Sequence, residues 1–273
     1  MACDISVLLP TRGRTGALTR SVLSLVNRAV KTDCLEILFG IDEDDPVARN
    51  HLETELLPML DQRNIEYSVV EFQPLGYTNL HQYANELSSH AQGKWLFMWN
   101  DDAIMDSASW DRQIVKHNGE FKVLSVHTHK DHPYSIFPIV PREWYEQIEA
   151  FSYHGMVDAF VSQIGYVLNI FERIPVHVTH DRADITGNNK DDTYMARRFH
   201  EGNPNSPDDF HHIDHIAIRG QCLEKLASYM AKNNIDTSFW DGVMAKTQDP
   251  WVQLRLNDTN KQMFQFNLKD FVQ

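Results

Sequence analysis

Residues 93–110 read GKWLFMWNDDAIMDSASW, an apolar run that ends abruptly on Asn100, Asp101 and Asp102. An apolar run of this length, introduced by Gly93, is typical of a strand that is buried on both faces, as the strands of a parallel sheet are. In open α/β sheets, ligands bind beyond the carboxyl ends of the strands. The three polar residues therefore predict a binding site where this strand ends.

The residues before this strand alternate between strand-like and helix-like patterns. Short strands are predicted at 4–10, 34–42 and 65–72. Helices are predicted between them from apolar residues at helical spacing, namely Leu18, Val22, Leu25, Val26 and Ala29, and then, after Pro46, Val47, Leu52, Leu56 and Leu60. Another helix is predicted over 79–90. This alternation predicts a mostly parallel sheet with helices on both faces and right-handed crossovers.

The pattern is looser beyond residue 103. It predicts helices near 106–117, 141–150 and 157–170, and strands near 121–127, 134–140 and 174–180. The segment EGNPNSPDD, residues 201–209, is rich in turn-forming residues and predicts a loop. We therefore expect an α/β domain over 1–200, with halves of about 1–105 and 106–200, and an extension over 201–273 that packs on it.

Composition excludes several classes of protein. The formal net charge of −13 is unfavourable for a nucleic-acid partner, because phosphate backbones are bound through basic surfaces. Cys3, Cys34 and Cys222 are widely spaced and fit neither a disulfide framework nor a paired-thiolate metal site. No apolar run is long enough for a transmembrane segment, and the N-terminus lacks a basic leader. The expectation is a soluble, cytoplasmic protein.

Three blocks in the first 105 residues together resemble a known enzyme family. They read ISVLLPTRGRTGALTRSVLSL at 5–25, LEILFGIDEDD at 35–45 and YANELSSHAQGKWLFMWNDDAIM at 83–105. In this order they resemble the nucleotide-sugar-dependent, inverting glycosyltransferases of family two, and a looser likeness continues to about residue 195. The resemblance implies a GT-A fold, which is a Rossmann-like α/β fold with a mixed, mostly parallel sheet and helices on both faces. Here a C-terminal extension would follow it.

The resemblance also implies which residues hold the donor, a nucleotide diphosphate sugar. In the family the first strand ends near the nucleobase, and an Asp at the end of the second strand bonds the base ring. An Asn before the fourth strand and the polar residues after it complete the pattern. Carried over to this sequence, the donor-binding residues are Pro10, Thr11, Arg12, Asp42, Asn85, Asn100 and Asp101.

A divalent cation, manganese or magnesium, is implied as cofactor. The family's Asp-any-Asp motif falls on Asn100-Asp101-Asp102, with Asn in place of the first carboxylate. Asp102 still supplies the anionic oxygen that a hard cation prefers, and Asp101 is the second choice. A His after a later strand completes the shell in many GT-A enzymes. Strand alternation places His180 on one face and His177 on the other, which favours His180 at the strand end. Such a cation would offset the repulsion between an acidic chain and a diphosphate.

Asp158, in the segment YHGMVDAFVSQIGYVL at 153–168, matches the family's catalytic base at the start of a helix. A carboxylate there would deprotonate an acceptor hydroxyl as it attacks the anomeric carbon. The resemblance thus implies hexosyl or deoxyhexosyl transfer, with inversion, to a glycan or another hydroxyl-bearing acceptor. Val157 stands where the family usually has Glu.

Other interpretations stay open at this point. The segment HTHKDH matches the zinc motif of metallo-β-lactamase-like hydrolases through His127, His129, Asp131 and His132, although Pro133 and Tyr134 replace the glycines that usually follow. The segment FHHIDH, at 210–215, is a second histidine-rich cluster. The departures at Asn100 and Val157 also fit a sugar-nucleotide binding protein without activity. Finally, Asn and Asp after a strand can form an ordinary turn, and an early helical Asp can serve only the helix dipole.

Overall fold

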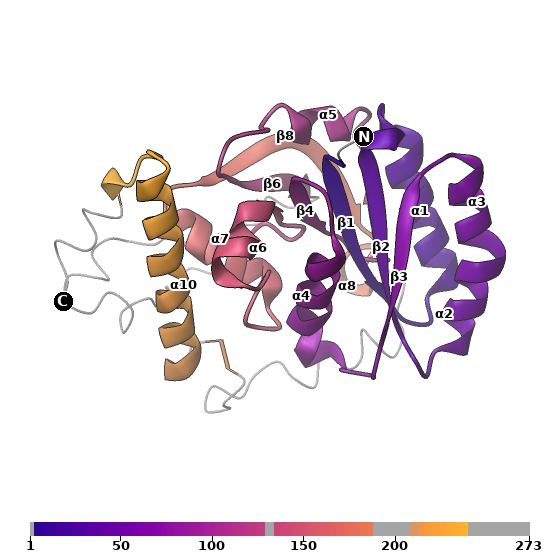
Figure 1. The fold of residues 1–273 in the computed structure, drawn as a ribbon. Coiled ribbons are helices and arrows are strands. Elements are labelled where there is room, and N and C mark those ends of the chain that lie inside the picture. The colour runs from indigo at the N-terminus through magenta and orange to yellow at the C-terminus, as the bar shows by residue number, and fades with distance from the viewer. Residues whose placement is uncertain (1–2, 129–133, 188–208, 211, 240–273) are drawn as a thin grey trace.

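The computed structural model describes residues 3–128, 134–187, 209–210 and 212–239. These residues form one sheet of eight strands in the order β3-β2-β1-β4-β7-β6-β8-β5, with helices packed against both faces (Figure 1). The predicted alternation of strands and helices in the first hundred residues is confirmed.

The first four strands are parallel. They are β1 (Ile5–Thr11), β2 (Leu35–Asp42), β3 (Glu66–Phe72) and β4 (Trp95–Met98). All residues of β2 and β4 are buried, as their uninterrupted apolar runs require. Because the strands are parallel, their carboxyl ends meet at one edge of the sheet, the lower edge in Figure 1.

The other strands make the sheet mixed. Strand β7 (Ile139–Pro141) pairs antiparallel with both β4 and β6 (Val123–Thr128), and β8 (Phe171–His180) runs parallel to β6. A further strand, β5 (Ala103–Met105), pairs antiparallel with β8 and places Ala103 opposite His180. The sequence pattern predicted no strand here and a helix from near 106. The three residues of β5 are too few to show a period, and α5 (Trp110–Val115) starts later than predicted.

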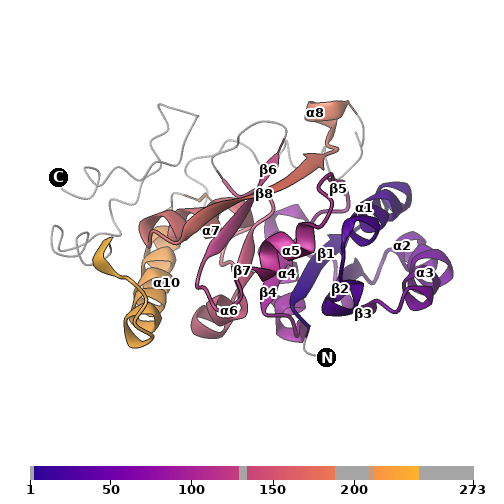
Figure 2. The ribbon, with the colours of Figure 1, turned by 90° about the horizontal axis from the view of Figure 1, so that it is seen from above.

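Two separate apolar clusters lie on the two faces of the sheet. One cluster joins the sheet to α1 (Thr15–Arg28), α2 (Pro46–His51), α3 (Leu57–Gln62) and α5. The other joins it to α4 (Leu80–His90), α6 (Arg142–Ile148), α7 (Val157–Val167) and α10 (Ile213–Lys232). Figure 2 shows α1–α3 and the pair α6 and α10 on opposite sides of the strands. Three short helices complete the described chain: η1 (Thr32–Cys34), η3 (Tyr77–Asn79) and α8 (Ala183–Thr186).

Helices α2 and α3 are joined by a π-helical turn, η2 (Leu52–Leu56). Their buried face repeats every four residues through Ala48, Leu52, Leu56 and Leu60. Val47, which the sequence pattern placed on this face, is 59% exposed. The period of the pattern was right, but the face starts one residue later.

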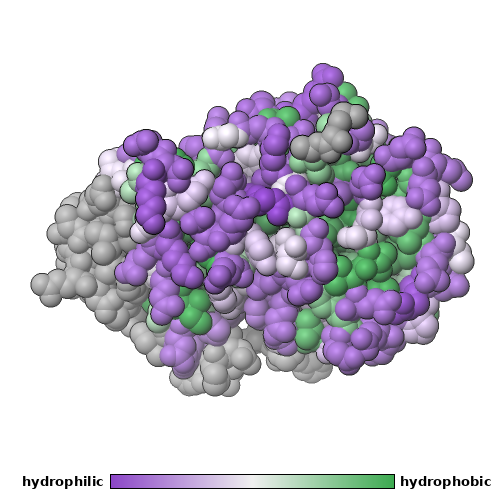
Figure 3. All heavy atoms as spheres, in the orientation of Figure 1, coloured by the Kyte–Doolittle hydropathy of each residue, from purple (hydrophilic) through white to green (hydrophobic). Residues whose placement is uncertain are grey.

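The edge strand β3 differs from the central strands. Its residues are mostly exposed or half-buried, and Val69 is 37% exposed. Figure 3 shows a hydrophobic area over β3 on a face that is otherwise mostly hydrophilic. The predicted strand is confirmed, and Phe72 is its only buried residue.

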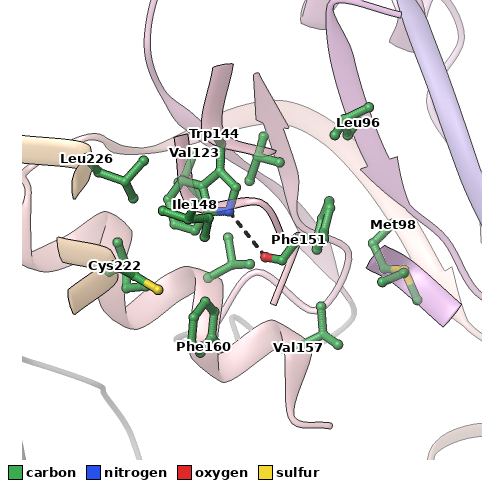
Figure 4. Close-up of a cluster of buried hydrophobic side chains, with 14 of the residues drawn as sticks. Leu96, Met98, Val123, Trp144, Ile148, Phe151, Val157, Phe160, Cys222 and Leu226 are labelled. Atoms are coloured by element: carbon green, nitrogen blue, oxygen red, sulfur yellow. Dashed lines mark hydrogen bonds between the residues drawn. The ribbon is translucent and has the colours of Figure 1, made fainter. Parts of the chain in front are cut away.

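Helix α10 packs on α6 and α7 as part of one apolar cluster. Figure 4 shows Cys222 and Leu226 of α10 beside Ile148 and Phe160 of those helices. The division of the chain at residue 200 stays a prediction, because 201–208 and 240–273 lie outside the described residues. No helix in the described part combines the length and the hydropathy needed to cross a membrane.

Candidate functional site

The carboxyl ends of β1, β4 and β8 bring together residues that are far apart in sequence. The Thr11 hydroxyl, at the end of β1, donates a hydrogen bond of 2.8 Å to Asp101 Oδ2, which follows β4. The pairing of Ala103 with His180 places the end of β8 beside the same turn. In addition, the Asp181 amide donates to the Asp102 carbonyl at 2.7 Å. Three of the predicted site segments therefore share one edge of the sheet.

Asp42 lies at the end of β2, as predicted, and is buried. Its Oδ2 accepts a hydrogen bond of 2.6 Å from the Arg12 guanidinium, and its Oδ1 accepts one of 2.5 Å from the Tyr83 hydroxyl. Arg12 also binds Asp44. Burial and the bond to Asp42 raise the pKa of Tyr83 to about 12, so this hydroxyl stays a donor at neutral pH. Asp42 and Arg12 thus form a polar pair at the carboxyl ends of β1 and β2.

Two adjacent buried carboxylates follow β4. Arg14 holds both, because its Nη1 lies 3.0 Å from Asp101 Oδ1 and 3.1 Å from Asp102 Oδ2. Burial raises the pKa of Asp101 to about 6, an effect that Arg14 opposes and Asp102 reinforces. For Asp102, burial acts in the same direction, but His180 and Arg14 outweigh it and the pKa is lowered. When both acids are ionised, one guanidinium leaves this group with net negative charge.

The position of Asp102 Oδ1 fits a divalent cation. This oxygen is buried and accepts no hydrogen bond from any described residue. His180 Nε2 is 3.1 Å away, which is an ion-pair distance. Two ligand atoms on neighbouring positions of a cation with bonds of about 2.1 Å lie roughly 3 Å apart. The oxygen and the nitrogen therefore have the separation of two ligands to one ion.

Asn100 completes this group. Its side-chain nitrogen Nδ2 is 3.5 Å from His180 Nε2, and its backbone carbonyl accepts a hydrogen bond of 3.1 Å from the Ser21 hydroxyl. Asp101, in contrast, has its two oxygens engaged by Thr11 and Arg14. The residues present could hold a cation through Asp102 and His180, with Asn100 beside them. The carboxylate of Asp102 and the imidazole of His180 are both common ligands of divalent cations.

A different trio of side chains among the described residues is close enough to share a metal. It is His117, Glu120 and Glu172, near the amino end of β8. Lys122 also lies 3.8 Å from Glu172, so a positive charge already faces the trio. This trio is distinct from the predicted metal ligands, Asp102 and His180, which lie at the opposite end of β8.

Asp158 is the second residue of α7, in its first turn, and is half-buried. Its Oδ1 accepts from the Ala159 amide at 2.8 Å. The loop before α7 touches η3: a Cβ added at Gly155 would meet the Thr78 carbonyl. Because η3 follows β3, this contact places the start of α7 on the carboxyl side of the sheet. The catalytic role of Asp158 stays a prediction.

Asn85 has a different set of contacts from the one its predicted role suggests. Its amide donates to the Ser152 carbonyl at 2.9 Å, and its Oδ1 accepts from the amides of Phe151 and Ser152 at 2.8 and 3.1 Å. These bonds hold the loop that leads into α7. Donor contact by Asn85 stays a prediction, and the observed bonds position the half of the chain that carries Asp158.

The alternative motifs are only partly described. His129, Asp131 and His132 of the zinc motif lie outside the described residues, while His127 stacks on His177 with ring centroids 4.9 Å apart. The single mixed sheet also differs from the antiparallel sandwich of that hydrolase class. Of the cluster at 210–215, Phe210 is buried and its ring lies 5.1 Å from that of His154. Trp144 and Phe151 are fully buried core residues.

The sequence analysis missed Arg14 and Tyr83. Arg14 belongs to the turn TRGRTG after the first strand, and its position at a strand end could have identified it. Tyr83 had no such signal, because only the packing of α4 on the sheet brings its hydroxyl to Asp42.

The sheet order, the helices on both faces and the polar edge define a GT-A fold, the fold of nucleotide-sugar glycosyltransferases. This confirms the predicted fold class. No family model matches the sequence, and no curated protein matches it either.

Among solved structures, the chain is similar to the mannosyltransferase PcManGT from Pyrobaculum calidifontis in complex with GDP-Man and Mn2+. The match has a TM-score of 0.55 and 13% identity, and it covers 99% of this chain and 86% of that one. The S. aureus TarS 1-349 complex with UDP-GlcNAc gives 0.54 and 12%, over 99% and 82% of the two chains. GalNAc-T7 with UDP, GalNAc and Mn2+ gives 0.51 and 12%, over 65% and 43%. At these identities the likeness establishes the fold.

Proposed function

We propose that this protein is an inverting glycosyltransferase that moves a sugar from a nucleotide diphosphate sugar to an acceptor hydroxyl. The observation that carries the proposal is the pair formed by Asp102 Oδ1 and His180 Nε2, 3.1 Å apart at the carboxyl edge of a GT-A sheet. Two structures of the same fold, PcManGT with GDP-Man and Mn2+ and TarS with UDP-GlcNAc, support a nucleotide sugar as the donor.

The donor lies along the edge formed by residues 1–105. Asp42, already held by Arg12 and Tyr83, accepts hydrogen bonds from the nucleobase, and Pro10 and Thr11 line the same strand end. Asn100 and Asp101 face the ribose and the diphosphate. A carboxylate fixed by neighbouring side chains can read a base ring because its oxygens cannot turn away.

A divalent cation, manganese or magnesium, would be held by Asp102 and His180 and would stabilise negative charge on the leaving diphosphate. The buried acids explain why a cation is needed: Arg14 neutralises only one of the two carboxylates it touches. Arg12 and Arg14 are two of the positive side chains at this edge. Their guanidinium groups can contact phosphate oxygens as well as carboxylates.

Asp158 is the general base. It takes the proton of the acceptor hydroxyl while the oxygen forms a bond to the anomeric carbon. The bond from that carbon to the diphosphate breaks, and the nucleoside diphosphate leaves with the electron pair. Attack from the side opposite the leaving group inverts the configuration of the sugar. In this proposal residues 106–200 form the acceptor half, and 201–273 form an extension. A cytoplasmic location stays a prediction from the sequence.

The test is a thermal-shift screen of UDP-, GDP- and dTDP-sugars with Mn2+ or with EDTA, since a ligand that binds the native state raises the melting temperature. A hit should depend on the cation. Asp158→Asn should then leave donor binding intact and lower transfer by about 10²- to 10⁴-fold, the usual contribution of a general base. The matched control is Glu143→Gln, which changes an acid in the first turn of α6.

Three outcomes separate the proposal from its alternatives. Binding without transfer or donor hydrolysis across a broad acceptor panel would identify a binding protein without activity. Bound zinc with no nucleotide binding would favour the hydrolase interpretation of His127, His129, Asp131 and His132. Loss of both binding and transfer in Asp158→Asn would give this residue a structural role and refute its role as base.

A further inference from the structure

Arg219, on α10, is fully buried, which is unusual for an arginine. Its Nη1 donates to the Phe210 carbonyl at 2.8 Å, and its guanidinium carbon lies 4.0 Å from the centre of the Phe210 ring. Burial lowers the pKa of Arg219 to about 9, although Asp209 acts in the opposite direction. Nε and Nη2 are buried and have no hydrogen-bond acceptor among the described residues.

The two unpaired nitrogens form one edge of the guanidinium. Nε and Nη2 point their hydrogens in parallel, and this edge matches the two oxygens of a carboxylate or phosphate. A buried cationic donor that lacks an acceptor is costly, and an oxyanion on this edge would satisfy both donors and the charge together. The side chain is therefore arranged as an anion-binding fork.

Contacts connect Arg219 to the start of α7. The Phe210 ring lies 5.1 Å from the His154 ring, and His154 in turn lies 4.6 Å from His215. His154 Nδ1 accepts from the amide of Met156, which precedes α7. Asp158 is only two residues beyond Met156. The fork is thus linked through Phe210 and His154 to the residues that lead into α7, whose first turn holds Asp158.

The fold places this group on the same side as the donor edge. Figure 1 shows α10 beginning at the level of the carboxyl ends of β1–β3. Farther along α10, Cys222 packs beside Phe160 of α7 (Figure 4). The donor edge has its own basic residues, because Arg12 bonds Asp42 and Arg14 bonds Asp101 there. The unpaired fork of Arg219 therefore suits the second substrate better than the donor.

We infer that Arg219 binds a phosphate or carboxylate group of the acceptor, so that the acceptor is an anionic molecule. This inference rests on the proposed function and names the class of its second substrate. The fork is covered by protein in the present conformation, so an anion enters when the surrounding groups move apart. Binding should therefore be measured at equilibrium.

The experiment uses inorganic phosphate as the probe, with calorimetric titration and thermal shift. Wild-type protein should bind phosphate and gain melting temperature. In Arg219→Met both effects should be lost, and in Arg219→Lys affinity should fall about tenfold or more, because lysine cannot make the paired bonds. Arg112→Met, which removes an exposed arginine of α5, is the matched control and should behave as wild type.

Without phosphate, Arg219→Met should be at least as stable as wild type, because an apolar side chain of similar size replaces an incompletely paired charge. The inference is overturned if phosphate binds wild type and Arg219→Met equally, or if it binds neither. A loss of stability in Arg219→Met without any phosphate effect would also overturn it, by showing that the residue serves only packing.

A second experiment distinguishes an acceptor anion from the donor diphosphate as the ligand of Arg219. It also tests the anion site separately from the proposed transferase function. If the acceptor anion occupies Arg219, phosphate and the nucleotide sugar should bind together, and Arg219→Met should keep its donor affinity. Displacement of phosphate by the donor would assign the fork to the donor diphosphate and overturn the inference. Phosphate binding without any nucleotide-sugar binding would leave the anion site standing while the proposed transferase function failed.

Discussion

The carboxyl edge of β1, β2 and β4, which is the proposed donor side, and the side of α7 and α10 stabilise their charged groups in different ways. On the donor side, each buried acid is paired with a base from a neighbouring strand end: Asp42 with Arg12, and Asp101 and Asp102 with Arg14. On the side of α7 and α10, Arg219 lies in an apolar cluster with no carboxylate within ion-pair distance among the described residues. Each acid of the donor side thus has a cationic partner, although one Arg14 serves two carboxylates, whereas Arg219 has two nitrogens without an acceptor among the described residues.

If the proposed function is right, this difference separates the requirements of the two substrates. A cation that arrives with the diphosphate would offset the carboxylate charge that Arg14 leaves uncompensated, so donor binding should depend on the cation. The acceptor substrate on the other side would meet the N–H groups of Arg219, which are buried and lack a partner among the described residues. Its affinity should therefore depend on the negative charge that it carries. The following changes test the two sides separately.

The largest effect is expected from His180→Ala. It removes one of the two strong candidate ligands, so cation-dependent donor affinity should fall by about 10- to 100-fold. The matched control is His177→Ala, on the same strand but on the opposite, exposed face. Calorimetric titration of the donor with and without Mn2+ measures both variants. Equal losses in the two variants would show that the strand, and not the predicted ligand, is responsible.

A smaller effect, on stability and on the acceptor side, is expected from Asn85→Ala. The change leaves two amides and one carbonyl of residues 151–152 without their partner, which costs about 1–3 kcal/mol in the free energy of unfolding. Transfer should suffer more than donor binding, because the loop leads to Asp158. Asn50→Ala, exposed on α2, is the control. If donor affinity fell most, Asn85 would contact the donor as the family resemblance implies.

The smallest effect is expected from Tyr83→Phe. Asp42 loses one hydrogen bond and keeps Arg12, so donor affinity should fall by up to about fivefold, the equivalent of about 1 kcal/mol. Tyr67→Phe removes a similar bond, to Asp61, at an exposed position and should change nothing. A loss of a hundredfold or more would mean that Tyr83 itself contacts the donor.

The sequence predicted the strands and helices of the first hundred residues well because their signals are local. Buried parallel strands give apolar runs that end on polar residues, and such ends must meet at one edge, so Thr11, Asp42 and Asp101 could be placed together from the sequence alone. The face of His180 followed from alternation along its strand, and its burial confirms this. The prediction missed β5 because it relies on such patterns, and a strand of three residues is too short to show one.

The other side could not be predicted in the same way. Nothing in the sequence around Arg219 distinguishes it from an exposed helical arginine, because its burial depends on the packing of α10 against α6 and α7. Likewise, Asn85 followed a family pattern, yet its bonds to residues 151–152 arise only when the two segments meet in the fold. Long-range contacts of this kind leave no periodic trace in a sequence.

The most direct test of the proposed donor site is a titration of Mn2+ followed by electron paramagnetic resonance, in the presence of a nucleoside diphosphate. The wild-type protein should bind one Mn2+ per chain, and Asp102→Asn should lose that site. Asp33→Asn, which changes an exposed acid of η1 near the start of β2, should keep it. If Asp102→Asn binds Mn2+ as tightly as wild type does, the cation is not held at this edge and the proposed donor site is wrong.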